Sequence, residues 1–284
     1  MIPAPFDYAA PTSLEEALGL LAEHGDEAKV LAGGQSLLPV LRMRLNAPEI
    51  LVDLGKLAEL TGVTDTGDHL RIGAMTPYYE LLKDPLVAEH AAVLPKALAD
   101  VADEQVRHRG TIGGSLAHAD PAGDTGAVAL ALDATLVVVG PGGERRVPAS
   151  EFFVDLFTTA VQDGEILTAI EVPKHTGWGG AYEKFVRVSH QWAIVAVAAV
   201  VRAEGGTITE AKIGLTNMGS TPLRVPAVEQ ALAGQPATAE AIADICARAG
   251  EGTSPPSDLN GDADYRRHLA GVLTRRAVLS AAGA

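Results

Sequence analysis

The chain has 284 residues, typical of about two domains, and 47% of them are apolar, which is enough for a substantial core. Its 22 Lys and Arg against 36 Asp and Glu give a net charge of −14. This charge argues against nucleic acid and anionic lipid surfaces as partners, because both repel a negative protein. The single cysteine, Cys246, excludes an internal disulfide and an iron–sulfur cluster held by this chain alone, which needs about four Cys ligands.

Targeting and membrane signals are not expected in this sequence. Residues 1–5 lack a basic region followed by an apolar stretch, so we expect no secretory signal. The most apolar run, 192–201, is shorter than the roughly 20 residues that cross a bilayer. We therefore expect a cytoplasmic protein without membrane insertion.

The first 55 residues predict a small α/β unit. Ser13 and Glu16 have the spacing of a capping box at the start of an apolar helical pattern, and Gly25 is expected to end that helix. The next expected elements are a strand at 29–32, a helix at 37–45 and a strand at 50–54. Gly33 and Gly34 stand between the first strand and the second helix, an arrangement suited to anion binding.

The next region, to about residue 175, predicts a mixed pattern. Residues 77–104 have a helical pattern that is interrupted at Pro85 and Pro95. Residues 109–126 are rich in glycine with little periodicity, and we expect a long functional loop there. The other expected elements are strands at 70–73, 135–139 and 166–172 and a helix at about 125–132.

The last region, 176–284, predicts strands followed by helices, which indicates an α+β domain with helices on one face of an antiparallel sheet. Gly205 and Gly206 are expected to form a hairpin turn. The expected strands are 181–188, 193–202 and 208–217, and the expected helices are about 227–233, 238–249 and 262–282. The predicted domains are 1–175, with subdomains of about 1–55 and 56–175, and 176–284.

Two glycine pairs carry the chemistry that the sequence suggests. GxGxxG after a strand, GxxxxGK[ST] and HExxH are all absent, so Rossmann, P-loop and zinc-protease sites have no support. Residues 32–36 (AGGQS) and 111–115 (TIGGS) each place two glycines beside hydroxyl or amide groups. Glycines let backbone N–H groups approach an anion closely, so the two loops together could hold both phosphates of a dinucleotide. Each pair alone is more simply a structural turn, and only the occurrence of both strengthens the case for a functional site.

These two loops, with Arg109 and Gly110 before the second and residues 116–124 after it, closely resemble the FAD-binding medium subunits of the molybdenum hydroxylases. That group contains aerobic carbon monoxide dehydrogenase and xanthine dehydrogenase. Residues 5–8, 165–173, 182–185 and 263–269 fit the same group, so the resemblance covers nearly the whole chain. It implies an α+β fold, with a two-subdomain FAD-binding domain (PCMH-type) followed by a C-terminal domain of antiparallel sheet with helices.

The resemblance also implies an FAD site. The first loop would contact FAD, and the second would hold the pyrophosphate from the other side. Asp124 would accept a hydrogen bond from the cofactor, Lys184 would lie near the isoalloxazine and Trp192 beside it. No catalytic residue and no metal ligand is expected. The residues expected to bind FAD are Lys29, Leu31, Ala32, Gly33, Gly34, Gln35, Ser36, Val101, Thr111, Ile112, Gly113, Gly114, Ser115, Ala117, His118, Asp120, Asp124, Leu167, Lys184 and Trp192.

Two positions depart from the pattern of the group. Relatives often carry Asn where this chain has Ser115, which keeps a donor with a shorter reach. Relatives also often carry an acid where this chain has Gln191, beside the predicted flavin edge. Neither change argues against FAD binding.

Simpler structural roles stand beside these assignments. His118, Asp120 and Asp124 resemble a metal site, but a turn-capping role for the histidine is the simpler interpretation. Asp124 could also be the N-cap of the following helix. The remaining alternatives are a solvated strand face for Lys184, core packing for Trp192, the polar face of the last helix or a partner contact for Arg266, Arg267, Arg275 and Arg276, and a buried inert thiol for Cys246.

The resemblance implies an electron-transfer role. FAD would accept electrons from [2Fe-2S] clusters on a small partner subunit and pass them to an external acceptor, while a large subunit carries molybdenum–pterin. The expected assembly is a dimer of heterotrimers. One alternative is a stand-alone FAD-dependent oxidase or reductase, but no acid–base pair for it is evident. Another is a non-enzymatic binding protein, against which the intact glycine loops argue. Carbon monoxide, a purine, an N-heterocycle and an aldehyde stay open as substrates, and quinone, NAD and oxygen as acceptors.

Overall fold

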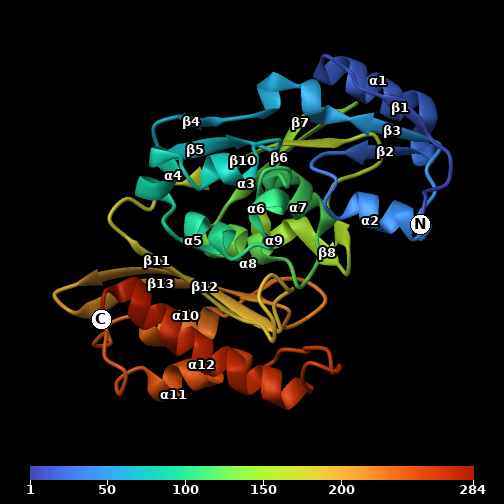
Figure 1. Cartoon of the computed structure of the whole chain (residues 1–284). Helices are drawn as coiled ribbons and strands as arrows, with labels where there is room; N and C mark the ends of the chain where they lie inside the picture. The colour runs from blue at the N-terminus through green and yellow to red at the C-terminus, as the bar shows by residue number, and fades with distance from the viewer.

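The computed structural model describes residues 1–284 and begins with a small α/β unit (Figure 1). The order of its parallel sheet is β1-β3-β2. Ser13 is the N-cap of the first helix as predicted, because its Oγ accepts from the backbone N–H of Glu16 at 3.1 Å, and Gly25 is the C-cap. The other half of the predicted capping box differs, because the Glu16 carboxylate accepts from the backbone N–H of Thr12, at 2.7 Å, and not from that of Ser13. The elements are β1 (Asp7–Ala9), α1 (Leu14–His24), β2 (Ala28–Leu31), α2 (Leu37–Arg42) and β3 (Ile50–Asp53), so the second helix is shorter than predicted.

The second subdomain is built on a five-stranded antiparallel sheet in the order β4-β5-β10-β6-β7. Pro85 and Pro95 each lie in the first turn of a short helix, where proline is tolerated. The elements are β4 (Val63–Asp65), β5 (His69–Gly73), α3 (Tyr78–Leu81), α4 (Pro85–His90), α5 (Val93–Ala99), α6 (Glu104–Arg107), α7 (Ile112–His118), α8 (Asp124–Ala131), β6 (Thr135–Gly140), β7 (Gly143–Pro148), α9 (Ala149–Phe152), β8 (Phe153–Asp155), β9 (Thr158–Thr159) and β10 (Ile166–Pro173).

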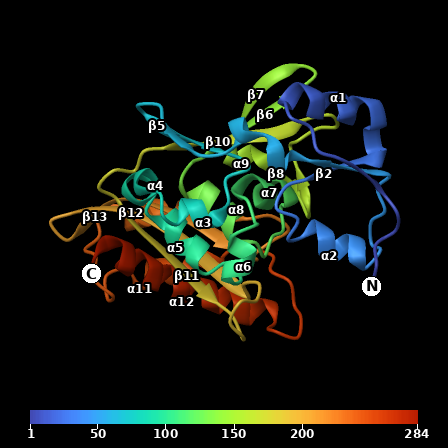
Figure 2. The same cartoon turned by 45° about the horizontal axis from the view of Figure 1, so that its top comes forward.

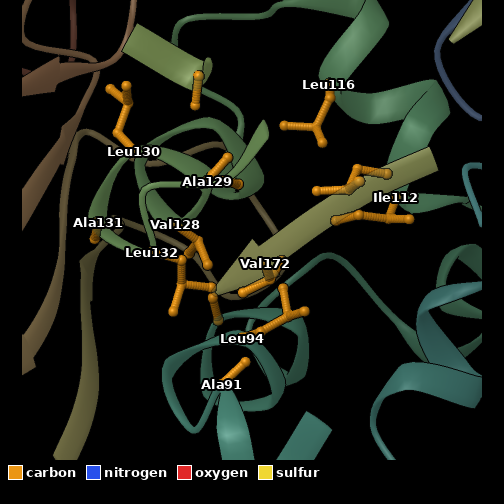
Figure 3. Close-up of a cluster of buried hydrophobic side chains, with 14 of the residues drawn as sticks. Ala91, Leu94, Ile112, Leu116, Val128, Ala129, Leu130, Ala131, Leu132 and Val172 are labelled. Atoms are coloured by element: carbon orange, nitrogen blue, oxygen red, sulfur yellow. The ribbon is translucent and has the colours of Figure 1, made fainter. Parts of the chain in front are cut away.

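The expectation of a long loop over 109–126 is wrong, because α7 occupies its middle. Ile112 and Leu116, four residues apart, are both buried and pack on the core beside Leu94 and Val172 (Figure 3). Two glycines and two polar residues among the seven positions of α7 hide this helical spacing in the sequence. The helix is therefore fixed by tertiary packing rather than by its own propensity.

The C-terminal region confirms the expected strands followed by helices, and the predicted fold class is confirmed. Gly205 and Gly206, both with positive φ, form the predicted hairpin turn. The elements are β11 (Gly179–Phe185), β12 (Val195–Glu204), β13 (Thr207–Thr216), β14 (Leu223–Arg224), α10 (Pro226–Leu232), α11 (Ala243–Ala247) and α12 (Ala263–Ala282), with 3-10 turns η1 (Gly25–Glu27), η2 (Leu54–Lys56), η3 (Ala58–Leu60) and η4 (Arg248–Gly250) elsewhere in the chain.

The C-terminal sheet has helices on both faces, where the sequence predicted one. Figures 1 and 2 show α10, α11 and α12 on one side of it and α5 and α8 of the preceding domain on the other. Alternate residues of β12 accordingly belong to two different cores: Ala196 and Ala198 to one, Val195 and Val197 to the other. This double burial explains the almost uninterrupted apolar sequence of β12.

Two glycines bring the domains into backbone contact. A Cβ on Gly180 of β11 would lie 2.4 Å from the backbone nitrogen of Val93, and one on Gly214 of β13 would lie 2.1 Å from the carbonyl oxygen of Ala127. Only glycine permits such an approach. The helices α5 and α8 therefore pack directly on the C-terminal sheet.

None of the helices combines the length and the apolar character of a membrane span.

Candidate functional site: a cavity between the domains

A cavity of about 1580 Å³ lies where the three regions of the chain meet. It is larger than typical pockets for one small ligand, which have roughly 300–1,000 Å³. Its walls include residues of β2 and α2, of α7 and β10, and of the C-terminal segments 187–194 and 256–260. A dinucleotide is of suitable size for this space.

The first glycine loop offers backbone donors to the cavity. It connects β2 to α2, and Gly34 has φ +74°, which favours glycine. The backbone N–H groups of Gly33, Gly34, Gln35 and Ser36 donate to no acceptor of this chain. All four residues line the cavity. Four consecutive free donors form a concave site for an anion such as a pyrophosphate.

The second glycine loop is arranged differently, because the backbone N–H groups of residues 112–115 already donate to acceptors of this chain. Thr111 caps α7, and its Oγ1 accepts from the backbone N–H of Gly114 at 3.2 Å. The N–H groups of Ile112, Gly113 and Ser115 donate to carbonyl oxygens of Thr76, Ala74 and Thr111. The second loop therefore gives the cavity a wall of small residues, rather than a second row of free N–H donors.

The two loops touch each other. A Cβ on Gly33 would lie 2.1 Å from the carbonyl oxygen of Arg109, just before the second loop. A Cβ on Gly114 would lie 3.1 Å from the Cβ of Ala32 and 2.7 Å from Oγ1 of Thr111. The glycines at these positions are thus required by the contact between the loops as well as by any ligand.

Asp124 joins the two domains at the cavity wall. Its carboxylate accepts a hydrogen bond from the Tyr182 hydroxyl at 2.6 Å and one from Lys184 Nζ at 2.9 Å. The expected N-cap role is wrong: Gly123 occupies the cap position of α8, and no side chain caps the helix. Burial raises the pKa of Asp124, and the bonds from Lys184 and Tyr182 act against that shift because they favour the ionised form.

The structure contradicts the simpler structural roles considered for Lys184 and Trp192. A solvated face for Lys184 is wrong, because only 5% of its side chain is exposed and it pairs with Asp124. Core packing for Trp192 is also wrong, because the residue is 59% exposed at the cavity. It belongs to the segment between β11 and β12. The two ends of this segment are joined by a hydrogen bond of 2.9 Å from the Ile194 N–H to the Phe185 carbonyl oxygen.

Arg266 does not lie on the polar face of the last helix. Its side chain is 1% exposed and donates to the Ile194 carbonyl oxygen and to Asp258 Oδ1, the latter at 2.8 Å. It therefore ties the Trp192 segment to the 256–260 segment, which also lines the cavity. Cys246 is buried and free, as predicted.

The histidine and acids that resemble a metal site have separate partners. The His118 ring packs on Phe157, with centroids 5.3 Å apart, and burial lowers its pKa. Asp120 Oδ1 accepts from the backbone N–H of Ala122 at 2.9 Å. The structure brings no three His, Cys, Asp or Glu side chains together in an arrangement that could hold a metal ion.

Most of the residues expected to bind FAD line the cavity, and three do not. Leu31, Ile112 and Lys184 lie behind its wall. Those on the wall are Lys29, Ala32, Gly33, Gly34, Gln35, Ser36, Val101, Thr111, Gly113, Gly114, Ser115, Ala117, His118, Asp120, Asp124, Leu167 and Trp192. Sequence reasoning missed Phe157, Arg187, Asn217 and 258–260, and these positions carry no recognisable motif.

The comparisons with known proteins decide the family. Residues 4–175 match the FAD binding domain in molybdopterin dehydrogenase, and residues 180–281 match the CO dehydrogenase flavoprotein C-terminal domain. The chain belongs to the FAD-binding medium subunits of the molybdenum hydroxylases. It is therefore an oxidoreductase subunit, and the free donors of Gly33–Ser36 beside the cavity fit the pyrophosphate of FAD.

Proteins named for different substrates are similar to this chain over almost its whole length. The carbon monoxide dehydrogenase medium chain of Hydrogenophaga pseudoflava is 41% identical over 284 residues, 99% of this chain and 98% of that one. A solved carbon monoxide dehydrogenase from the same organism superimposes with a TM-score of 0.95, at 42% identity, covering 99% of this chain and 98% of that one. The solved quinoline 2-oxidoreductase from Pseudomonas putida 86 superimposes with a TM-score of 0.94 at 36% identity, covering 100% of this chain and 99% of that one.

Proposed function

We propose that this chain transfers electrons within a molybdenum hydroxylase complex, from [2Fe-2S] clusters of a small subunit, through its FAD, to an external acceptor. A large subunit would carry molybdenum–pterin and the substrate site, in a dimer of heterotrimers in the cytoplasm. The only cysteine, Cys246, is buried in this chain's own core, so any cluster has to be on another chain. The large subunit would then determine the substrate. This agrees with the similarity of this chain to medium chains of enzymes named for different substrates.

The observation that carries the proposal is the row of free N–H donors from Gly33 to Ser36 at a cavity large enough for a dinucleotide. These donors would bind the pyrophosphate, and the Thr111–Ser115 wall would confine it from the other side. Bound FAD supplies the ability to accept and release electrons one or two at a time. The chain orients it: Asp124 would accept a hydrogen bond from it, and the exposed Trp192 would cover part of its ring.

On this proposal, the chain itself does not oxidise the organic substrate. The cavity wall contains Asp124, which is already engaged by two donors, and His118, whose pKa is lowered by burial. These two groups therefore do not form the free acid–base pair that a stand-alone oxidase would use on an organic substrate. The isolated chain is therefore expected to oxidise organic substrates negligibly.

The decisive experiment is an absorption spectrum of the purified chain before and after adding FAD, followed by chromatography of the cofactor released on denaturation. Stoichiometric FAD with flavin absorbance near ~450 nm supports the proposal. Stable binding of FMN instead would contradict the role given to the pyrophosphate donors. If the folded chain binds no flavin, the same measurement on the chain co-expressed with its partner subunits decides, and a flavin-free complex would reject the proposal.

A further inference from the structure

Tyr182 and Lys184 approach Asp124 from the opposite domain. They are two residues apart on β11, so both side chains leave the same face of the strand. That face packs on α5 and α8, and Asp124 is the first residue of α8. The residues opposite them on β12 are Ala198 and Ala196, whose small side chains leave room for the two long ones.

The contact is buried, and each polar group in it has a hydrogen-bond partner. Asp124 is 4% exposed and Tyr182 8% exposed. Each carboxylate oxygen of Asp124 accepts one donor, Oδ1 from Tyr182 and Oδ2 from Lys184, and Lys184 Nζ also donates to the Asp100 carbonyl oxygen at 3.0 Å. A buried carboxylate stays ionised only when it is paired and hydrogen-bonded, so both donors determine its charge and orientation.

Of the other ionisable groups near Asp124, only Asp100 opposes its negative charge. Asp100, after α5, raises the pKa of Asp124 by like-charge repulsion, in addition to the larger effect of burial. The Tyr78 phenol is buried nearby and stays neutral, because burial raises its pKa. Lys184 is the positive partner and Tyr182 the neutral donor. Removing either donor from the carboxylate therefore favours its protonated form.

We propose that Tyr182 is a positioning residue of the FAD site: it holds the Asp124 carboxylate ionised and oriented at the cavity wall, so that strand β11 contributes to flavin binding although none of its own residues line the cavity. This rests on the proposed function. Asp124 lines the cavity, whereas Tyr182 and Lys184 do not, so their effect on FAD has to pass through Asp124. The C-terminal sheet thereby determines the ionisation and the orientation of Asp124, a residue of the FAD-binding domain.

The test is FAD affinity as a function of pH, measured by quenching of flavin fluorescence in the full chain or its complex. Tyr182→Phe should weaken FAD binding about tenfold at pH 7, as expected for a lost hydrogen bond to a charged group. In this variant, the pH at which FAD affinity falls on acidification should be higher than in the wild type, because Asp124 is then protonated more easily. Asp124→Asn should weaken binding and remove that pH dependence.

The double variant Tyr182→Phe with Asp124→Asn separates positioning from a general structural effect. The inference predicts that it binds FAD no more weakly than Asp124→Asn alone, because Tyr182 acts only through the carboxylate. Tyr79→Phe is the matched control, since the Tyr79 hydroxyl bonds only to Lys83 and lies outside the cavity. It should bind FAD like the wild type.

Three results would overturn the inference. Additive losses in the double variant, or a Tyr182→Phe protein that is less stable but has an unchanged pH profile, would leave Tyr182 a structural residue. If Tyr182→Phe does not fold, Lys184→Met replaces it, since removal of the other donor should move the profile in the same direction; an unmoved profile rejects the inference. A wild-type chain and complex without FAD would instead reject the proposed function itself.

Discussion

Gly33 and Arg109 are in direct backbone contact: a Cβ on the glycine would lie 2.1 Å from the arginine carbonyl oxygen. This contact joins the first glycine loop to the chain that enters the second. Because Arg109 and Gly110 immediately precede Thr111, the N-cap of α7, the position of one loop determines that of the other. The shape of the anion site is therefore a property of both loops together.

Gly33→Ala is expected to reduce FAD affinity at least about tenfold, because the added methyl group separates the loops and displaces the free N–H donors. Flavin titration of the folded variant measures this. Gly19→Ala is the control, since Gly19 lies in α1 and a methyl group there would have no neighbouring atom within 4 Å. It should keep full affinity and stabilise the chain by about 0.5–1 kcal/mol. Equal affinities of the two variants would show that the loop contact is dispensable.

Gly214→Ala is expected to destabilise the chain by about 1–3 kcal/mol, since the methyl group would meet the Ala127 carbonyl oxygen in the tight contact between β13 and α8. Denaturant unfolding monitored by circular dichroism measures the change. Gly142→Ala, in the turn between β6 and β7, has no neighbour within 4 Å and should change stability by less than about 0.5 kcal/mol. If Gly214→Ala were equally harmless, the domains would be able to separate at this point.

Glu171→Gln is expected to destabilise the chain at neutral pH by about 1 kcal/mol, a modest value because solvent screens the half-exposed Arg146. Burial alone would raise the pKa of Glu171, but Arg146, His69 and Arg71 outweigh it and hold that pKa below its usual value. A carboxyl with a lowered pKa stabilises the fold above its unfolded pKa, and this contribution is lost as the pH falls through the folded pKa.

Unfolding free energies measured between pH 7 and about pH 3 should therefore show wild type and Glu171→Gln converging below about pH 4. Glu204→Gln removes an exposed pair with Arg202 and serves as the control, with little change at any pH. A constant difference between wild type and Glu171→Gln across this range would mean that the charge of Glu171 does not stabilise the fold.

Cys246 should resist alkylation in the native chain. It is fully buried in the C-terminal core, and burial raises the pKa of its thiol to about 12, so almost no thiolate is present at pH 8. Labelling by a maleimide at pH 8 is expected to be at least about a hundredfold slower than in guanidinium, where one label per chain should be found. Rapid labelling of the folded chain would indicate local opening of α11.

The regular elements of the fold could largely be predicted from the sequence, because their signals are local. The Ser13 cap, the Gly205 hairpin and the strands of the C-terminal sheet follow from side-chain type and spacing. The helix α7 could not be predicted, since Gly113 is needed by its contact with Ala74 and weakens the helical pattern. Short edge strands such as β1 and β4 also escaped, because three residues carry too little periodicity.

The candidate site could be predicted only as far as its motifs. The glycine pairs themselves indicated both loops, the resemblance added Asp124, and most of these residues line one cavity. The bond between Asp124 and Tyr182 depends on how β11 packs on α8, which no local pattern encodes. The same holds for Arg266. Its place in the last helix suggests a solvent-facing side chain, but the side chain is buried and donates to the carbonyl oxygen of Ile194, which is distant in the sequence.

The alternation of β12 between two cores has a consequence for folding. Ala196 and Ala198 pack against the helices of the preceding domain, so the last hundred residues on their own would expose one complete apolar face of their sheet. Exposed apolar sheet surface favours aggregation. We therefore expect the two regions matched by the family models, 4–175 and 180–281, to unfold together in one cooperative transition and not as two independent units.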